Sequence, residues 1–222
     1  MPARKTSQVQ RKRTTMEAGR RIPTGLLMGG IAAVVIVVAL IAVLLSGQSA
    51  PAGTAPQPAD QPVQVSGTLP AFPASGIDPA VGQPFPTITS IDFNGQPVTI
   101  DPTDGHPKLV MALAHWCPHC QAEVPTFVSW LRDHPLPSNV ELIAIATAID
   151  PTRGNYPPSA WLARENWPGQ ALVDDANSSA LAALGLNSFP GWVLVGSDGT
   201  VLERLTGEQG TDVYPSLVAL LK

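Results

Sequence analysis

The only two cysteines in this chain of 222 residues, Cys117 and Cys120, are separated by two residues, Pro118 and His119. A structural disulfide usually closes a longer loop, because a longer loop removes more entropy from the unfolded chain. A disulfide between two cysteines at Cys-x-x-Cys spacing closes a very short loop and so removes little of this entropy. The spacing therefore indicates a chemically active pair rather than a structural crosslink.

The residues around the pair predict a strand followed by a helix. Apart from its first residue, the run Lys108–Ala114 is continuously apolar, and it has the length of a central strand buried on both faces. After it, a helix is predicted from Pro118 onward, with apolar residues at helical spacing at Val124, Phe127, Val128 and Leu131. Cys117 would then lie at a helix N-terminus, where free N–H groups and the helix dipole favour a thiolate.

This placement gives the two sulfurs different roles. We expect Cys117 to be the more exposed, attacking sulfur, and Cys120, one turn into the helix, to be the one that resolves the mixed disulfide. Pro118 suits a first helical turn, where its missing N–H costs nothing. His119, when protonated, is a second positive neighbour, so both intervening residues are predicted to tune the thiolate.

Four other uses of the pair compete with redox chemistry. A c-type haem site needs a histidine directly after the second cysteine, where this chain has Gln121. Structural zinc usually takes four ligands, and no second cysteine pair exists. A copper carrier would recruit His115 or His119, and a structural disulfide in an oxidising compartment is the fourth use. Redox chemistry is favoured over these, and no metal site is assigned.

The N-terminal residues predict a membrane anchor. Residues 1–25 carry seven Lys or Arg and one acidic residue, and Leu26–Leu45 is an uncharged apolar run of 20 residues. Such a run is long enough to span the ~30 Å hydrocarbon core of a bilayer. The positive-inside rule then places residues 1–25 in the cytosol and the remainder outside. A cleaved signal peptide is the alternative, although its apolar core is normally shorter.

The basic cluster is thus explained by membrane orientation, and no nucleic-acid partner is expected. Residues 46–80 are rich in Pro, Ala, Gln, Gly and Ser and lack apolar periodicity, which predicts a disordered linker. The remaining residues, 81–222, are ample for one core.

Within residues 81–222 the pattern predicts an α/β domain with a central mixed sheet flanked by helices. An N-terminal β-hairpin is expected at Thr87–Ile91 and Pro97–Ile100, joined by Asn94-Gly95. Further elements follow in the order strand, helix, strand, helix, a closing strand pair and a terminal helix: 140–148, 159–166, 171–173, 178–184, 191–195, 201–206 and 211–221.

These motifs resemble the thioredoxin superfamily. The pattern Cys117-x-x-Cys120-x-x-Glu123-x-Pro125, with Phe189-Pro190 before a later strand, is similar to the TlpA/ResA-type membrane-anchored thiol–disulfide oxidoreductases. The resemblance covers residues 81–222 and implies a thioredoxin-like fold. It also implies a redox-active Cys117–Cys120 disulfide with no other cofactor.

The resemblance implies roles for four further residues. Pro190 matches the family's cis-proline beside the active disulfide, which helps to hold an extended substrate, and Glu123 matches an acid that relays protons to the resolving thiol. Trp116 and Phe189 correspond to substrate-contact positions. For Glu123 the alternative is a solvated carboxylate on the helix surface.

The resemblance leaves the direction of electron transfer open. The Pro118-His119 dipeptide is found in strong oxidants such as DsbA. Glu123 and the predicted anchor are instead typical of the members of the superfamily that act as reductants. We expect reduction or exchange of disulfides in exported proteins or in cytochrome c maturation. A DsbA-like oxidase and a copper-binding chaperone are the alternatives.

The expected location is a bacterial cell membrane, which the chain crosses once with the catalytic domain outside. The expected partners are proteins that carry thiols or disulfides, together with a membrane electron donor or acceptor.

Overall fold

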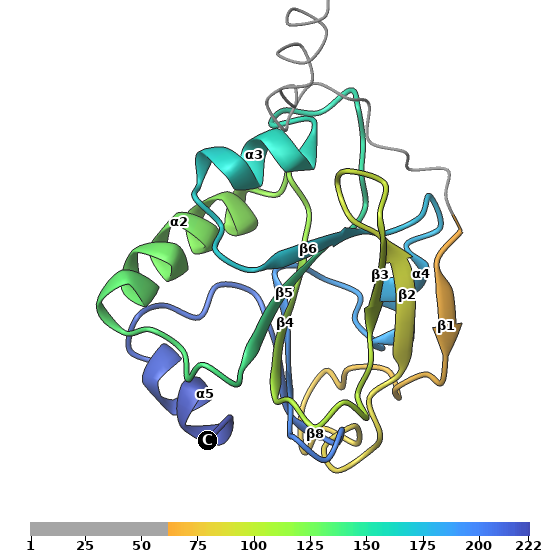
Figure 1. The fold of residues 1–222 in the computed structure, drawn as a ribbon, viewed down its shortest axis with the longest axis vertical. Helices are drawn as coiled ribbons and strands as arrows, with labels where there is room; N and C mark the ends of the chain where they lie inside the picture. Colours follow the sequence, from red (N-terminus) through yellow and green to blue (C-terminus); the bar gives the residue numbers. More distant parts are fainter. Residues whose placement is uncertain (1–61) are drawn as a thin grey trace, which may run out of the picture. The chain divides into compact units, whose positions relative to one another are not determined.

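Strand β4 (Lys108–Leu113) runs through the centre of the sheet in the computed structural model, which describes residues 62–222 (Figure 1). All six of its residues are buried. It pairs in parallel with β5 (Glu141–Ala146) and antiparallel with β7 (Gly191–Val195). Because helices and loops cover both faces, β4 is continuously apolar from Leu109 to Leu113 instead of alternating.

The eight strands form one mixed sheet in the order β1-β2-β6-β5-β4-β7-β8, with β3 paired to β2. The remaining strands are β1 (Gln64–Ser66), β2 (Thr87–Ile91), β3 (Pro97–Ile100), β6 (Gln170–Val173) and β8 (Val201–Thr206). The β2–β3 hairpin and the β7–β8 pair are antiparallel, as the turn residues predict. The predicted α/β class, mixed sheet and N-terminal hairpin are confirmed.

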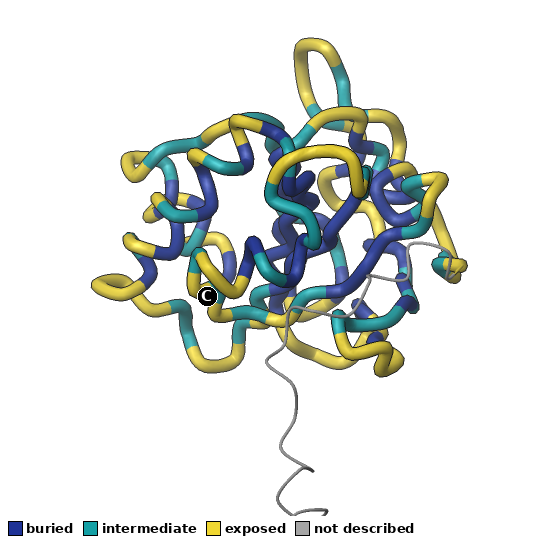
Figure 2. The backbone as a smooth tube through the Cα atoms, turned by 90° about the horizontal axis from the view of Figure 1, so that it is seen from above, coloured by how far each residue is buried: buried dark blue, intermediate teal, exposed yellow. Residues whose placement is uncertain are grey.

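Helices lie on both faces of the sheet. Helices α2 (Pro118–Asp133), α3 (Pro158–Arg164) and α5 (Tyr214–Leu220) lie on one side of it in Figure 1, and α4 (Ser179–Ala183) lies on the other. Each side has its own apolar cluster, one containing residues of α2, α3 and α5 and the other residues of α4. Figure 2 shows the resulting pattern, with buried backbone segments in the interior and exposed segments around them.

The expected linker boundary at residue 80 is wrong for residues 62–80. Strand β1 adds to the sheet edge by pairing with β2, and Leu69 and Ala80 are buried in the cluster that contains α4. The guanidinium of Arg204 binds the Asp78 carboxylate and also donates to the carbonyl oxygen of Pro70 at 3.0 Å. These contacts order a segment whose composition alone predicts disorder. The sequence does not reveal them, because the residues that make them lie far apart along the chain.

The predicted membrane segment Leu26–Leu45 and residues 46–61 of the predicted linker lie outside the described residues. Within residues 62–222, none of the helices has the length and apolar character needed to cross a bilayer.

Arg204 provides a test of how the N-terminal segment is held. Its side chain is fully buried against Asp78, which is 9 % exposed. Replacing Arg204 with Ala leaves that carboxylate unpaired and should lower the free energy of unfolding by about 3–5 kcal/mol, measured by urea denaturation. The matched control, Arg164→Ala, removes an ion pair between an exposed arginine and the half-buried Glu165 and should cost less than about 1 kcal/mol.

The stabilisation of the fold by the Arg204–Asp78 pair depends on pH in a direction that the structure predicts. The hydrogen bond from Arg204 holds the pKa of Asp78 below its ordinary value of 3.8. The stabilisation is therefore present above that value and is lost only as the pH falls through the pKa of the folded state. Equal losses of stability in Arg204→Ala and Arg164→Ala would contradict the conclusion that Arg204 holds the N-terminal segment in place.

Candidate active site

The end of β4 and the start of α2 position Cys117. Cys117 is the N-cap of α2 with an extended backbone, and Pro118 occupies the first helical turn. The Cys117 N–H donates to the carbonyl oxygen of Ala114 at 3.0 Å, and the Cys117 carbonyl accepts from the N–H of Gln121 at 3.0 Å. The strand–cysteine–helix arrangement predicted from the sequence is confirmed, and it directs the helix N-terminus at the cysteine pair.

The two thiols differ in burial. Both cysteines are free; Cys117 is 6 % exposed and Cys120 is completely buried. Burial raises the pKa of the Cys120 thiol, since the anion would lose its hydration. Cys117 is thus the sulfur that an incoming disulfide can reach, and Cys120 lies behind it.

The peptide bond between Phe189 and Pro190 is cis, as the resemblance implied for this proline. The Cys117 thiol donates to the carbonyl oxygen of Phe189 at 3.6 Å, so the proline loop lies directly against the first sulfur. The N–H of Gly207, just after β8, donates to the carbonyl oxygen of Pro190 at 2.8 Å. The structure therefore brings together the cysteine pair and a loop more than 70 residues away in the chain.

Trp116 and Phe189 form an aromatic surface beside Cys117. Their rings meet edge to face, with centroids 5.4 Å apart. The indole N–H of Trp116 donates to the carbonyl oxygen of Ala148 at 2.7 Å, and the guanidinium of Arg153 lies 4.1 Å from its ring centroid. The two residues that the resemblance assigned to substrate contact are thus adjacent and half-buried.

His115 is a structural residue of this site. The N–H of Asp150 donates to its Nε2, so the proton is on Nδ1, which donates to the carbonyl oxygen of Gly154 at 2.8 Å. Burial lowers the pKa of the imidazole, which favours this neutral form. Both ring nitrogens are therefore occupied in holding the loop after β5, and a role for His115 as a copper ligand would require breaking these bonds.

His119 points away from the protein core. Its side chain is 68 % exposed, and Nδ1 lies 2.5 Å from a carboxylate oxygen of Glu208. Glu208 belongs to the connection between β8 and α5, and no feature of the sequence marked it. The predicted tuning residue therefore has a carboxylate partner, which opposes the positive field of a protonated His119 at the thiolate.

Glu123 lies one helical turn after Cys120 and is 3 % exposed. Its Oε1 accepts from the hydroxyl of Tyr214 at 2.7 Å, and its Oε2 accepts from the N–H of Gln209 at 2.9 Å. Burial raises the pKa of the carboxyl although both hydrogen bonds oppose that rise. The alternative of a solvated surface carboxylate is wrong, and Tyr214 is a site residue that the sequence analysis missed.

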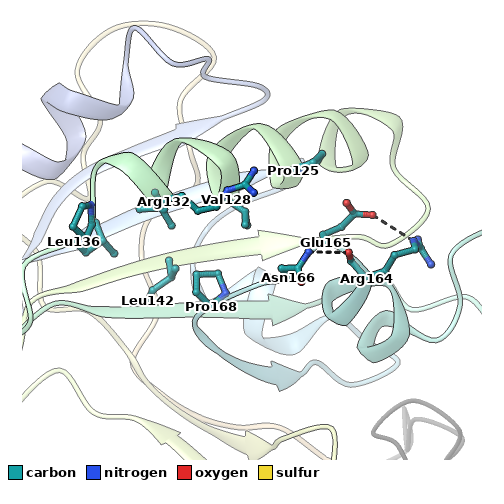
Figure 3. A pocket seen from close by; sticks show the side chains of 11 residues that line it. Pro125, Val128, Arg132, Leu136, Leu142, Arg164, Glu165, Asn166 and Pro168 are labelled. Carbon is teal, nitrogen blue, oxygen red and sulfur yellow. Dashed lines mark hydrogen bonds and ion pairs between the residues drawn. The ribbon is translucent and has the colours of Figure 1, made fainter.

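A cavity of about 660 Å³ lies elsewhere on the domain, between α2, the end of α3 and the start of β5 (Figure 3). Pro125, Val128, Leu136 and Leu142 form apolar parts of its lining, together with Arg132 and Arg164. None of the predicted site residues lines it. The cysteine pair therefore lies outside this cavity.

Among residues 62–222, no group of three or more His, Cys, Asp or Glu side chains is arranged to hold a metal ion.

The fold and the paired thiols define the chain as an oxidoreductase with a thioredoxin-like fold. The Redoxin family model matches residues 80–221, and the chain belongs to this family.

Solved structures share the fold. A secreted disulfide oxidoreductase of Mycobacterium tuberculosis, described as homologous to Escherichia coli DsbE, is 24 % identical with a TM-score of 0.50, covering 60 % of this chain and 95 % of its own. The thioredoxin domain of a Bacteroides vulgatus thiol–disulfide oxidoreductase is 18 % identical with a TM-score of 0.51, covering 64 % and 99 %. A Chlorobium tepidum thiol:disulfide interchange protein is 17 % identical with a TM-score of 0.50, covering 66 % and 99 %.

The difference in burial between the thiols predicts the order of their alkylation. When the reduced chain is treated with iodoacetamide under native conditions, peptide mass spectrometry should find Cys117 modified at least about tenfold faster than Cys120, because access and a raised pKa both protect Cys120. In urea the two rates should converge. Equal native rates would contradict the assignment of Cys117 as the attacking sulfur.

Proposed function

We propose that the chain is a membrane-tethered, extracytoplasmic thiol–disulfide oxidoreductase that reduces or exchanges disulfides in exported proteins or during cytochrome c maturation. One observation carries the proposal: a reachable Cys117 lies at a helix N-terminus against the Phe189-Pro190 loop, with Cys120 buried behind it. The helix N-terminus supplies the field that stabilises an attacking thiolate.

The reaction takes place in two exchanges. The Cys117 thiolate attacks one sulfur of a substrate disulfide, that S–S bond breaks, and the substrate's other sulfur leaves as a thiolate that takes up a proton. Cys120 then loses its proton and attacks the sulfur of Cys117. The mixed disulfide breaks, the Cys117–Cys120 disulfide forms, and the substrate leaves with its second thiol. Two electrons and two protons have passed to the substrate.

The neighbouring residues support these steps. Trp116 and Phe189 offer an apolar surface to the polypeptide on either side of the substrate cysteine. Glu123, one turn beyond Cys120 and buried, is the acceptor for the proton that Cys120 must lose, since its raised pKa makes it a better base than an exposed carboxylate. An open aromatic surface beside the reactive sulfur suits an extended polypeptide, so we propose a protein substrate.

The direction that we favour is reduction or exchange. A DsbA-like oxidase is the second candidate, and the Pro118-His119 dipeptide is the observation in its favour. A strong oxidant depends on stabilising its nucleophilic thiolate, but here the carboxylate of Glu208 beside His119 offsets that positive charge. A copper-binding chaperone, the candidate from another class, has less support because His115 is engaged in the fold.

The proposed location rests on the sequence. The apolar run Leu26–Leu45 with its preceding basic residues would anchor the chain with residues 1–25 in the cytosol. The active site would then face exported proteins, and a membrane protein would supply or remove its electrons.

Trapping the mixed disulfide tests the function. Without Cys120 the second exchange cannot occur, so a Cys120→Ala chain expressed in a bacterial membrane should accumulate disulfide-linked complexes, seen as bands on non-reducing gels that vanish with reductant. Cys117→Ala is the matched control and should trap nothing. If Cys120→Ala traps no more than Cys117→Ala, and the wild-type chain does not reduce insulin, the proposed function fails.

A further inference from the structure

The connection between β8 and α5 contacts the active site at three consecutive residues. The N–H of Gly207 binds the carbonyl oxygen of Pro190, Glu208 pairs with His119, and the N–H of Gln209 donates to Glu123. The side-chain amide of Gln209 donates back to the carbonyl oxygens of Thr206 and Gly207, at 3.1 and 2.9 Å. The segment thereby holds itself in the conformation that reaches Glu123.

Tyr214, the first residue of α5, completes the contacts to Glu123. Its side chain is fully buried, and its ring packs edge to face on Phe127 and Trp130 with centroids 5.1 and 5.4 Å away. The packing fixes the ring, so the hydroxyl is directed at Oε1 of Glu123. Each carboxylate oxygen of Glu123 therefore has one donor, and both donors come from the β8–α5 region.

The titratable groups that face Glu123 are few. Cys120 lies one turn before it on the same face of α2, and Tyr214 and Glu208 face it from the β8–α5 region. Glu208 raises the pKa of Glu123 slightly by charge repulsion, and it is itself paired with His119. Tyr214 is thus the one side chain among residues 62–222 that donates a hydrogen bond to this carboxylate.

We propose that Tyr214 is a positioning residue that sets the pH at which Glu123 becomes able to accept the Cys120 proton. The proposal rests on the thiol–disulfide exchange function proposed above. A hydroxyl that donates to a carboxylate stabilises the ionised form, and burial without that donor favours the protonated form. Protonated Glu123 cannot take up the Cys120 proton, so the loss of the Tyr214 hydroxyl slows resolution at low pH.

Oxidised glutathione allows the resolving step to be measured in the full-length chain. Cys117 attacks it, releasing one reduced glutathione and leaving the other bound through a mixed disulfide. Cys120 then passes its proton to Glu123 and attacks Cys117; the second glutathione leaves as a thiolate, and the Cys117–Cys120 disulfide forms. Acid quenching and mass spectrometry follow the decay of the mixed disulfide between about pH 5 and pH 9.

Tyr214→Phe should move the inflection of this pH profile upward by about one to two pH units, the size expected when a carboxylate loses one hydrogen bond. Below the inflection, resolution should slow about tenfold for every pH unit by which the inflection moves. The matched control is Tyr156→Phe, which removes the hydroxyl of the only other tyrosine. Its profile should overlay that of the wild type.

Glu123→Gln should abolish the inflection. Adding Tyr214→Phe to Glu123→Gln should then change the rate at which the mixed disulfide resolves by no more than about twofold.

If Tyr214→Phe fails to fold, 3-fluorotyrosine incorporated into the Tyr156→Phe chain replaces it as the test. The fluorinated phenol is a stronger donor, so the inflection should move to lower pH.

The inference is overturned if wild type and Tyr214→Phe share one profile, or if Tyr214→Phe has the same effect with and without Glu123. Failure of the proposed function gives a different result, namely a wild-type chain that forms no mixed disulfide with glutathione. In that case the inference is tested by following the ¹³C resonance of the Glu123 carboxyl as the pH changes. For the inference to stand, Tyr214→Phe must move the titration of this carboxyl to higher pH.

Discussion

The active site depends on burying the inner face of the first two turns of α2. Cys120 and Glu123 are buried on that face, Glu123 against residues of the β8–α5 region, while Cys117 remains at the helix end. Burial disfavours the charged form of each group, which keeps the Cys120 thiol protonated and makes Glu123 a stronger base. One constraint thus separates an attacking thiol from a resolving one and places a proton acceptor behind the second.

Much of this arrangement was predictable from local sequence. The run Lys108–Ala114 and the spacing of Pro118 and the cysteines define a strand, an N-terminus and a helix within about 30 residues, and the bounds of the β2–β3 hairpin are as predicted. Glu123 and Pro190 were found only because the motif resembles a known family. The periodicity of apolar residues does not indicate that either of them belongs to a functional site.

The parts that sequence analysis missed depend on pairings between distant residues. Strand β1 is three residues long and exists because β2 offers a free edge, and the ordering of residues 62–80 depends on Arg204. Tyr214 looks like an ordinary helix residue until the fold brings it to Glu123 across 91 positions. Glu208 likewise belongs to no motif in the sequence, yet it bears on the direction of the reaction by pairing with His119.

The reduction potential of the Cys117–Cys120 couple tests the central claim most directly. Equilibrating the full-length chain with glutathione buffers and counting free thiols gives this potential. We predict a value near or below the ~−270 mV of thioredoxin, because Glu208 pairs with His119 and so opposes the stabilisation that a protonated His119 would give the Cys117 thiolate. A value near the ~−120 mV of DsbA would contradict it and would assign the chain to disulfide formation.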